Sequence, residues 1–157
     1  MLSGLNSHLP AEIGKRCQMH KKFLRSYESL EAIYEFTEKI LASRDVAQSV
    51  RFPVHFAMEE LFTNMVKYNP DNSNDILLDV ETDDNGITVS LTDFDVDAFD
   101  VTTSREVDIN APLEQRKVGG LGLHLIQKMV DTLKYEYSDR QSTVTFTKAS
   151  GQDHVSD

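Results

Sequence analysis

The chain lacks the cysteines that a disulfide framework would require. Cys17 is the only cysteine among 157 residues, so no bridge can form within the chain and a reducing compartment is the default expectation. The five histidines are scattered and show no paired spacing of the kind that metal ligands share. These shortages exclude a disulfide-stabilised scaffold and give no sign of a histidine-based metal centre.

Long apolar runs are also missing. The N-terminal stretch MLSGLNSHLPAEIGKRC has no apolar core long enough for a signal peptide, and no segment approaches the length of a membrane span. We therefore expect a cytoplasmic protein that has no membrane partner.

Positive charge is scarce. The chain has 16 Lys and Arg against 26 Asp and Glu, which gives a formal net charge of −10. A surface this acidic repels phosphate backbones, so we expect no direct binding to nucleic acid. A small phosphate-bearing ligand is still compatible with this charge, because it needs only a local positive site or a helix N-terminus.

The remaining composition is that of one globular domain. Hydrophobic residues make up 39% and charged residues 27% of the chain, which is ordinary for a soluble domain of this length. We expect a loose N-terminal arm over residues 1–17, a domain over 18–150 and a frayed tail over 151–157.

The first half of the chain shows one strand pattern followed by two helix patterns. Alternation predicts a strand over residues 19–23, after which Ser26 can cap a helix. A second helix is predicted over 47–68, in which Pro53 must lie in the first turn or else kink the helix. The expected apolar face of the first helix consists of Leu30, Ile33, Tyr34, Ile40 and Leu41, and that of the second of Val50, Val54, Ala57, Leu61 and Met65.

The second half contains the clearest hairpin. Residues 76–82 and 87–93 flank DDNG, where Asn85 and Gly86 are expected to supply positive φ angles. A long polar connection over 94–118 leads to a helix with apolar residues at helical spacing, and strands follow over 134–138 and 142–148. Strands grouped in pairs predict an α/β (α+β) two-layer sandwich, with a mixed, largely antiparallel sheet and helices on one face.

Glu60 and Asn64 are four residues apart in the second helix, in the run MEELFTNMVKY. Side chains at i and i+4 share one helix face. An asparagine carbonyl suits a hard cation such as Mg²⁺, and a carboxylate one turn away can take a proton from an attacking hydroxyl. The alternative interpretation is a solvated polar pair, which is common on helices.

The glycine-rich run VGGLGL over 118–123 opens the last helix. Glycines let the backbone approach a phosphate, and the free N–H groups of a first helical turn point toward it. Taken alone, the run is equally typical of a flexible helix cap.

Asp93 ends the second strand of the hairpin. A carboxylate there can accept a hydrogen bond from an adenine amino group, whereas the simpler interpretation is a turn-forming aspartate. The acidic run over 93–100 resembles a calcium loop only superficially, because it lacks the central glycine and the terminal glutamate. We therefore expect no calcium site.

In their order and spacing, these motifs resemble those of the anti-sigma-factor serine-protein kinases over residues 19–148. That family belongs to the GHKL ATPase superfamily, which also contains histidine kinases, DNA gyrase and MutL-type repair proteins. The resemblance implies the Bergerat ATP-binding fold.

The run MEELFTNMVKY resembles the N box of the family. This implies that Glu60 is the catalytic base, that Asn64 binds Mg²⁺ and that Lys67 lies near the phosphates. The run APLEQRKVGGLGLHLIQKMVD resembles the lid end and the second glycine box, which places Arg116 and Lys117 near the nucleotide. The backbone contacts with phosphate that the resemblance implies come from Gly119, Gly120, Leu121, Gly122 and Leu123.

The first glycine box departs from the family pattern Asp-x-Gly-x-x-Phe. Its counterpart begins at Asp93, has Asp95 in place of the glycine and has Phe99 one residue late. Because the family packs adenine against that glycine, a side chain and a negative charge at Asp95 are expected to weaken nucleotide binding.

The resemblance implies an Mg-ATP-dependent serine/threonine protein kinase that sequesters a sigma factor and phosphorylates an anti-sigma-factor antagonist of the STAS type. It also allows a homodimer, which family members often form. The altered first glycine box leaves an alternative of another class, a non-catalytic sequestering module with a degenerate nucleotide site. A lone histidine-kinase catalytic domain fits less well, because no helix with a phosphoacceptor histidine is evident.

Overall fold

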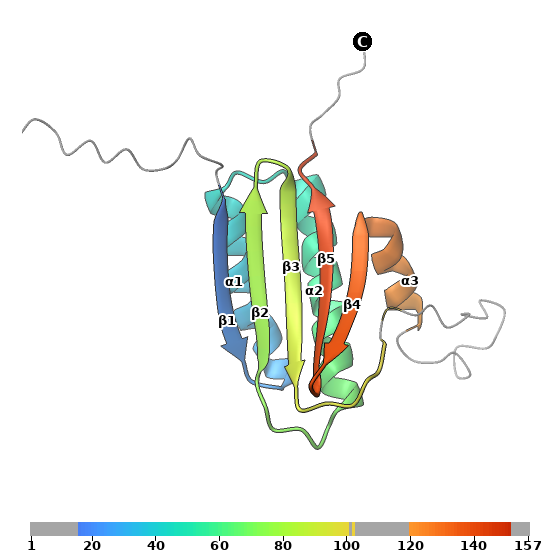
Figure 1. Ribbon diagram of the computed structural model, residues 1–157. Coiled ribbons are helices and arrows are strands. Elements are labelled where there is room, and N and C mark those ends of the chain that lie inside the picture. Colours follow the sequence, from blue (N-terminus) through green and yellow to red (C-terminus); the bar gives the residue numbers. More distant parts are fainter. Residues whose placement is uncertain (1–15, 101, 103–119, 152–157) are drawn as a thin grey trace, which may run out of the picture.

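The computed structural model of the chain describes residues 16–100, 102 and 120–151. These residues form a sheet with helices packed behind it (Figure 1). The elements in chain order are β1 (Cys17–Phe23), η2 (Tyr27–Ser29), α1 (Leu30–Ser43), α2 (Gln48–Tyr68), β2 (Ile76–Asp83), β3 (Gly86–Phe94), α3 (Gly120–Met129), β4 (Thr132–Ser138) and β5 (Gln141–Ala149).

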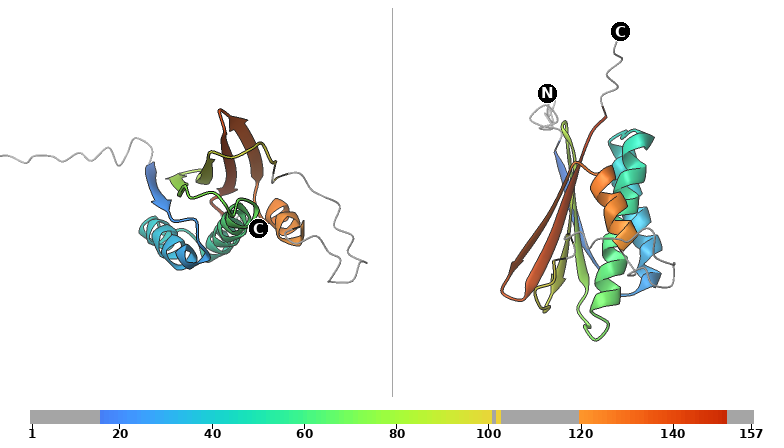
Figure 2. Two further views of the ribbon diagram at one scale, coloured as in Figure 1. Left: turned by 90° about the horizontal axis from the view of Figure 1, so that it is seen from below. Right: turned by 90° about the vertical axis from the view of Figure 1, so that its right-hand side faces the viewer.

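The sheet has the strand order β1-β2-β3-β5-β4. Each pairing between these strands is antiparallel. The helices lie on one face of the sheet, as Figure 2 shows from below and from the side. The predicted two-layer sandwich with a largely antiparallel sheet is confirmed, and the described part of the sheet contains no parallel pair.

Helix α2 forms the centre of the core. The helix has 21 residues and begins at Gln48, one residue later than the predicted start at Ala47. The whole predicted apolar stripe is buried, and Pro53 is buried with it in the second turn. Because the stripe is fixed against β3 and β5, the polar face of α2 has a defined direction relative to the sheet. The residues of the predicted stripe, from Val50 to Met65, are each no more than 4% exposed.

Helix α1 follows its predicted face less closely. Ile33, Ile40 and Leu41 are buried, as expected. Tyr34 was expected on the same face, but it is 52% exposed and its ring stacks on His55 of α2, with 4.2 Å between centroids. The expectation for Tyr34 is therefore wrong, because an aromatic stack at the rim replaces burial in the core.

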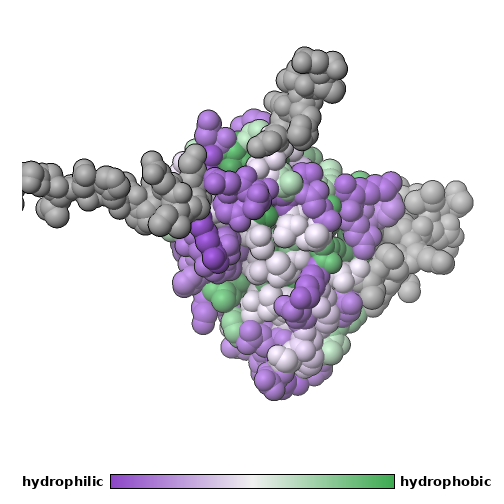
Figure 3. Space-filling view, turned by 45° about the horizontal axis from the view of Figure 1, so that its top comes forward, coloured by the Kyte–Doolittle hydropathy of each residue, from purple (hydrophilic) through white to green (hydrophobic). Residues whose placement is uncertain are grey.

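The sheet face that no helix covers carries hydroxyl side chains. Ser90 and Thr145 lie 2.9 Å apart, and Thr92 and Thr143 lie 3.0 Å apart, in cross-strand pairs between β3 and β5. Figure 3 shows the molecule obliquely, with polar and pale surface dominating and apolar surface in small separate patches. Of the helices in the described ranges, none combines the length and the apolar character that a bilayer crossing needs.

The β2–β3 hairpin is present, but its turn is one residue earlier than expected. Asp83 pairs with Gly86, so the turn residues are Asp84 and Asn85. A positive φ occurs at Gly86, at 150°, and not at Asn85. The Asp83 carboxylate accepts hydrogen bonds from the N–H groups of Asn85 at 2.7 Å and Gly86 at 3.0 Å, so a side chain closes the turn without a left-handed asparagine.

The close packing of Gly86 against β5 gives a prediction about stability. A Cβ atom built at Gly86 would overlap the carbonyl oxygen of Lys148. We expect Gly86→Ala to lower the free energy of unfolding by about 1–3 kcal/mol, the usual cost of overpacking, as measured by urea denaturation. Asn85→Ala is the matched control, because Asn85 is exposed and its turn hydrogen bond uses the backbone N–H. Equal stability of the two variants would show that the contact with β5 is not tight.

Candidate functional site

Glu60 and Asn64 share the face of α2 that is directed toward α3. Asn64 is 6% exposed and lines a pocket at the end of the sheet. Glu60 lies against the first turn of α3, where a Cβ atom at Gly122 would overlap the Glu60 carboxylate. A side chain at Gly122 would therefore force the end of the Glu60 side chain to move. The structure therefore brings the predicted catalytic pair next to the predicted glycine-rich helix start.

The environment of Glu60 favours its protonated form. Burial raises the pKa of Glu60 above the ordinary value of 4.5, and the neighbouring charge of Glu59 raises it further. Lys67 acts in the opposite direction and lowers it. A raised pKa brings a carboxylate closer to the range in which general bases work best at neutral pH.

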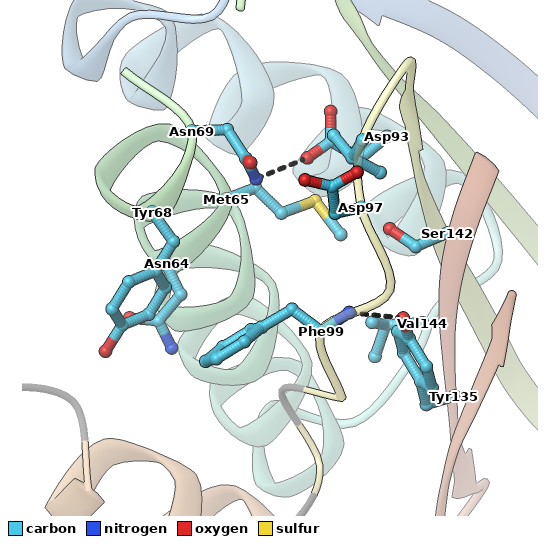
Figure 4. A pocket seen from close by; sticks show the side chains of 11 residues that line it. Asn64, Met65, Tyr68, Asn69, Asp93, Asp97, Phe99, Tyr135, Ser142 and Val144 are labelled. Atoms are coloured by element: carbon cyan, nitrogen blue, oxygen red, sulfur yellow. Dashed lines mark hydrogen bonds between the residues drawn. The ribbon is translucent and has the colours of Figure 1, made fainter. Parts of the chain in front are cut away.

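The pocket next to Asn64 has apolar walls and a carboxylate on one side. Met65, Val96 and Val144 provide apolar surface, Asp93 contributes a buried carboxylate, and Asp97 contributes a second, exposed one. Figure 4 shows the ring of Phe99 extending across this space toward α2. The remaining free volume is about 20 Å³. A single water molecule needs about 10–15 Å³, so the pocket has room for about one water.

Aromatic contacts hold Phe99 in this position. Its ring packs against Tyr68, with 5.4 Å between centroids, and its backbone N–H donates to Tyr135 Oη at 2.9 Å. Phe99 thereby joins the end of α2 to β4. In this structure, the protein's own side chains take up the space beside Asp93.

Asp93 is paired with an arginine that the sequence analysis did not single out. The side chains of Arg25 and Asp93 are 4% and 2% exposed and form a salt bridge. Arg25 Nη1 also donates to the carbonyl of Met65 at 2.9 Å, and Arg25 Nε donates to the carbonyl of Asn74 at 3.2 Å. Removing one partner of a buried pair generally costs about 3–5 kcal/mol, so this pair anchors the end of β3.

Asp95 adopts a left-handed backbone conformation that is common for glycine, and its side chain lies outside the pocket. Its φ is 57°, in the left-handed region that glycine adopts readily. Its side chain is 70% exposed and forms an ion pair with Arg140 at 2.7 Å. The negative charge expected at the adenine floor is therefore directed to the β4–β5 turn.

That turn fixes one wall of the pocket. Arg140 has a φ of 61°, and its carbonyl accepts a hydrogen bond from Val96 N–H at 2.9 Å. Tyr137 Oη donates to the carbonyl of Val96 at 2.9 Å, and Arg140 pairs with Asp97 at 2.9 Å. The segment after β3 is thus tied to the sheet from both sides of Val96.

The other predicted site residues fall into three groups. Lys67 lies at the end of α2 with its Nζ 5.9 Å from the Tyr68 ring centroid. Leu121 is 48% exposed and Leu123 is buried, both in the first turns of α3, which begins at Gly120. The predicted residues Arg116, Lys117 and Gly119 lie outside the residues that the structure describes.

Sequence reasoning missed the residues that hold the site together. Arg25, Asn69 and Arg140 reach their partners across separations of 68, 24 and 45 residues. The available signal was weak. Arg25 lies two residues after the end of the predicted strand, and Asn69 directly follows the predicted helix. Polar side chains at element ends are too common for that position alone to identify a site.

The chemical groups at this end of the molecule match those of a nucleotide bound with a cation. The start of α3 offers backbone N–H groups, and Gly122 has no side chain to obstruct them, which suits a phosphate. Asn64 offers a neutral oxygen to a cation. Asp93 is an acceptor for an amino group, although Arg25 engages it in this structure.

The wider hollows of the described surface include one at the opposite end of the sheet. It has a volume of about 460 Å³ and is lined by residues 43–47, 82–87 and their neighbours. None of the predicted site residues lines it, whereas a hollow of about 360 Å³ next to the candidate site is lined by Asn69, Asp95 and Val96 among others. We favour the end with Asn64 and Asp93, because its polar groups converge.

Comparison with known families identifies the class of protein. Residues 23–148 match the family described as Histidine kinase-like ATPase domain. The chain belongs to this family, which confirms the superfamily resemblance seen in the sequence and indicates ATP as its ligand. No curated protein sequence matches the chain.

A solved structure shares the fold. The structure of the RsbU and RsbW domains of Rv1364c from Mycobacterium tuberculosis matches with a TM-score of 0.62 and 16% sequence identity. The match covers 86% of this chain and 33% of that chain, so this chain spans about a third of the length of that protein. At this identity, the likeness establishes the fold alone.

The raised pKa of Glu60 predicts how stability depends on pH. Because the folded pKa lies above the ordinary value of 4.5, the folded state binds the proton more tightly than the unfolded state does. The contribution of Glu60 to stability therefore falls as pH rises through the window above 4.5, and the ionised group is unfavourable at neutral pH. We expect Glu60→Gln to unfold at a higher urea concentration than the native protein at pH 7. This advantage should shrink toward pH 4.5, and a variant that is less stable at pH 7 would contradict the burial of the charge.

Proposed function

We propose that the chain is an anti-sigma factor and a serine/threonine protein kinase that uses Mg-ATP. Membership of the ATPase family supports the nucleotide, and the motif resemblance around Glu60 and Gly122 supports the kinase class. The observation that carries the proposal is the contact between the Glu60 carboxylate and Gly122 at the start of α3. That contact supports the proposal, because a carboxylate of raised pKa lies beside a helix start that suits a phosphate.

The proposed roles follow from the position of each residue. Bound Mg-ATP would supply the phosphoryl group and the charge-neutralising cation. Asn64, buried on the same face of α2, would hold Mg²⁺ by its side-chain oxygen. Glu60 would take the proton of an incoming serine or threonine hydroxyl. Lys67, at the end of the same helix, would lie near the phosphates and offset part of their negative charge.

The proposed partners are proteins. One is a sigma factor, held inactive in the cytoplasm, and the other is an anti-sigma-factor antagonist of the STAS type, whose hydroxyl is the acceptor. Phosphorylation of the antagonist would leave the sigma factor bound, so the chain would regulate transcription by partner switching. Positioning and charge neutralisation would supply most of the rate enhancement.

A second candidate is a sequestering module without catalysis. It is favoured by the Arg25–Asp93 pair, which engages the proposed adenine acceptor, and by the small free volume beside it, about 20 Å³. In that case, the chain would bind the sigma factor without a nucleotide.

Titration with nucleotide separates the two candidates. We expect calorimetry to detect Mg-ATP binding to the native protein, and we expect Asn64→Ala to lose most of the Mg²⁺-dependent part of the affinity, because it removes the proposed metal ligand. Measurements with and without Mg²⁺ isolate that part. An absence of binding up to about 1 mM nucleotide, the upper end of ordinary KM values, would favour the sequestering module.

Replacing Glu60 separates catalysis from binding. Glu60→Gln keeps the size and hydrogen-bonding capacity of the side chain but removes the base, so we expect phosphate transfer to the antagonist to fall about 10²–10⁴-fold. Nucleotide and sigma-factor binding should persist. Single-turnover transfer of radiolabelled phosphate and a sigma-factor pull-down measure the two properties.

Two further variants make this test specific. Glu59→Gln removes a carboxylate from the exposed neighbouring position and should retain transfer. Gly122→Ala should impair transfer by displacing the Glu60 carboxylate, although alanine is the better helix former. Full transfer by Glu60→Gln would remove Glu60 from the mechanism.

A further inference from the structure

Asp95, directly after β3, has a backbone conformation that is unfavourable for a residue with a side chain. Its φ is 57°, in the left-handed region where a Cβ atom crowds the following carbonyl oxygen. Glycine adopts this conformation without that cost, and aspartate does so when its short polar side chain finds a partner. The carboxylate of Asp95 pairs with Arg140 Nε at 2.7 Å, so its partner lies in the β4–β5 turn.

Arg140 contacts each residue of the segment 95–97. Its guanidinium donates to Asp95 through Nε at 2.7 Å and to Asp97 through Nη1 at 2.9 Å. Between these two contacts, the carbonyl of Arg140 accepts a hydrogen bond from the N–H of Val96 at 2.9 Å. Because the guanidinium is planar and its donors are fixed relative to one another, the two ion pairs define the directions of the residues on both sides of Val96.

The turn that carries Arg140 is itself well defined. Asp139 and Arg140 have φ angles of 51° and 61°, and they connect Ser138 to its cross-strand partner Gln141. Two consecutive residues with positive φ are typical of the type I′ turn, whose twist matches that of a hairpin. The β4–β5 hairpin therefore sets the position of the guanidinium independently of the segment that the guanidinium holds.

The segment that Arg140 holds forms part of the pocket next to Asn64. Val96 is 3% exposed and lines this pocket together with Asp97. The side chain of Asp95 is 70% exposed and lies outside the pocket. A change of φ at Asp95 would displace Val96, which is the next residue, and would thereby alter the pocket wall.

We propose that Arg140 is a positioning residue for the nucleotide pocket. Its two ion pairs stabilise the left-handed conformation of Asp95, and Arg140 thereby compensates for the absence of the glycine that this conformation favours. Arg140 also balances the carboxylates of Asp95 and Asp97, which would otherwise be two like charges near an anionic ligand. The effect on binding rests on the proposed function, because it assumes that this pocket takes part of the nucleotide.

The nucleotide-free protein tests the backbone part of the proposal. The NMR chemical shifts of Asp95 Cα and Cβ report the sign of φ, and we expect the native shifts to indicate the left-handed conformation. Arg140→Gln keeps a side chain at the same turn position but removes both ion pairs, so it should move these shifts toward those of a residue with negative φ. Left-handed shifts that persist unchanged in Arg140→Gln would overturn the proposal.

Calorimetry on the full chain, with Mg-ADP as the probe, tests the effect on binding. We expect Arg140→Gln to bind about 3- to 10-fold more weakly than the native protein, in keeping with the small contribution of exposed ion pairs. Lys134→Gln is the matched control, because it removes the same charge from an exposed ion pair in β4. The control should bind within about twofold of the native protein. Equal losses in the two variants would overturn the proposal, because they would reflect net charge alone.

A second substitution, at Asp95, separates backbone conformation from charge. Asp95→Gly/Arg140→Gln and Asp95→Ala/Arg140→Gln have the same net charge as the native protein, but only glycine adopts the left-handed conformation without a cost from Cβ. We expect the double variant with glycine to bind Mg-ADP as tightly as the native protein and the one with alanine to bind more weakly. Equal affinities of the two double variants would overturn the proposal, because the conformation at position 95 would then have no effect.

The outcomes also separate this inference from the proposed function. If the native protein and a folded Arg140→Gln variant bind Mg-ADP equally well, Arg140 does not position the pocket and the nucleotide site stands. If neither binds nucleotide although both are folded by circular dichroism, the proposed function fails, and the positioning role of Arg140 fails with it.

Discussion

The buried salt bridge between Arg25 and Asp93 is the constraint on which the site depends. Through Arg25, it connects the segment after β1 to the carbonyl of Met65 in α2, to the loop before β2 and to the end of β3. A charged pair with side chains at most 4% exposed is costly to desolvate, and it is retained only when its hydrogen bonds are well satisfied. The same pair therefore fixes the position of Asp93, whose side chain lines the pocket next to Asn64.

The two ends of the candidate site differ in how much of their hydrogen-bonding surface is open to a ligand. At the α3 end, the Glu60 carboxylate lies close to Gly122, and the helix start provides backbone donors. At the β3 end, Asp93 is paired and Phe99 lies across the pocket. The helix start at α3 is therefore the open end of the candidate site, and the end beside Asp93 is filled by the protein's own side chains.

Local patterns in the sequence were sufficient to predict the fold and the composition of α2. The spacing of Val50, Val54 and Leu61 correctly identified the buried face of a long helix, and this placed Glu60 and Asn64 on one adjacent face. The hairpin was predictable from alternation, but its turn was not, because the Asp83 side chain competes for the turn N–H groups. Tyr34 was misplaced because a helical periodicity cannot distinguish burial from stacking on a neighbouring helix.

The contacts that close the site could not be predicted in this way. Asp93 was recognised at its strand end, but its partner lies 68 residues away, and only the sheet brings the two together. Asp95 was recognised as a departure from glycine, yet the direction of its side chain depends on Arg140 in a turn 45 residues later. The catalytic and metal-binding roles of Glu60 and Asn64 stay predictions, since geometry alone does not show turnover.

The location of the nucleotide is the central claim, and backbone amide NMR shifts on titration with Mg-ADP test it most directly. The account predicts that the largest shifts occur around Asn64, around Asp93 and Phe99, and in the first turn of α3. Shifts concentrated instead in residues 43–47 and 82–87, which line the wider hollow of about 460 Å³ at the opposite end of the sheet, would contradict the account.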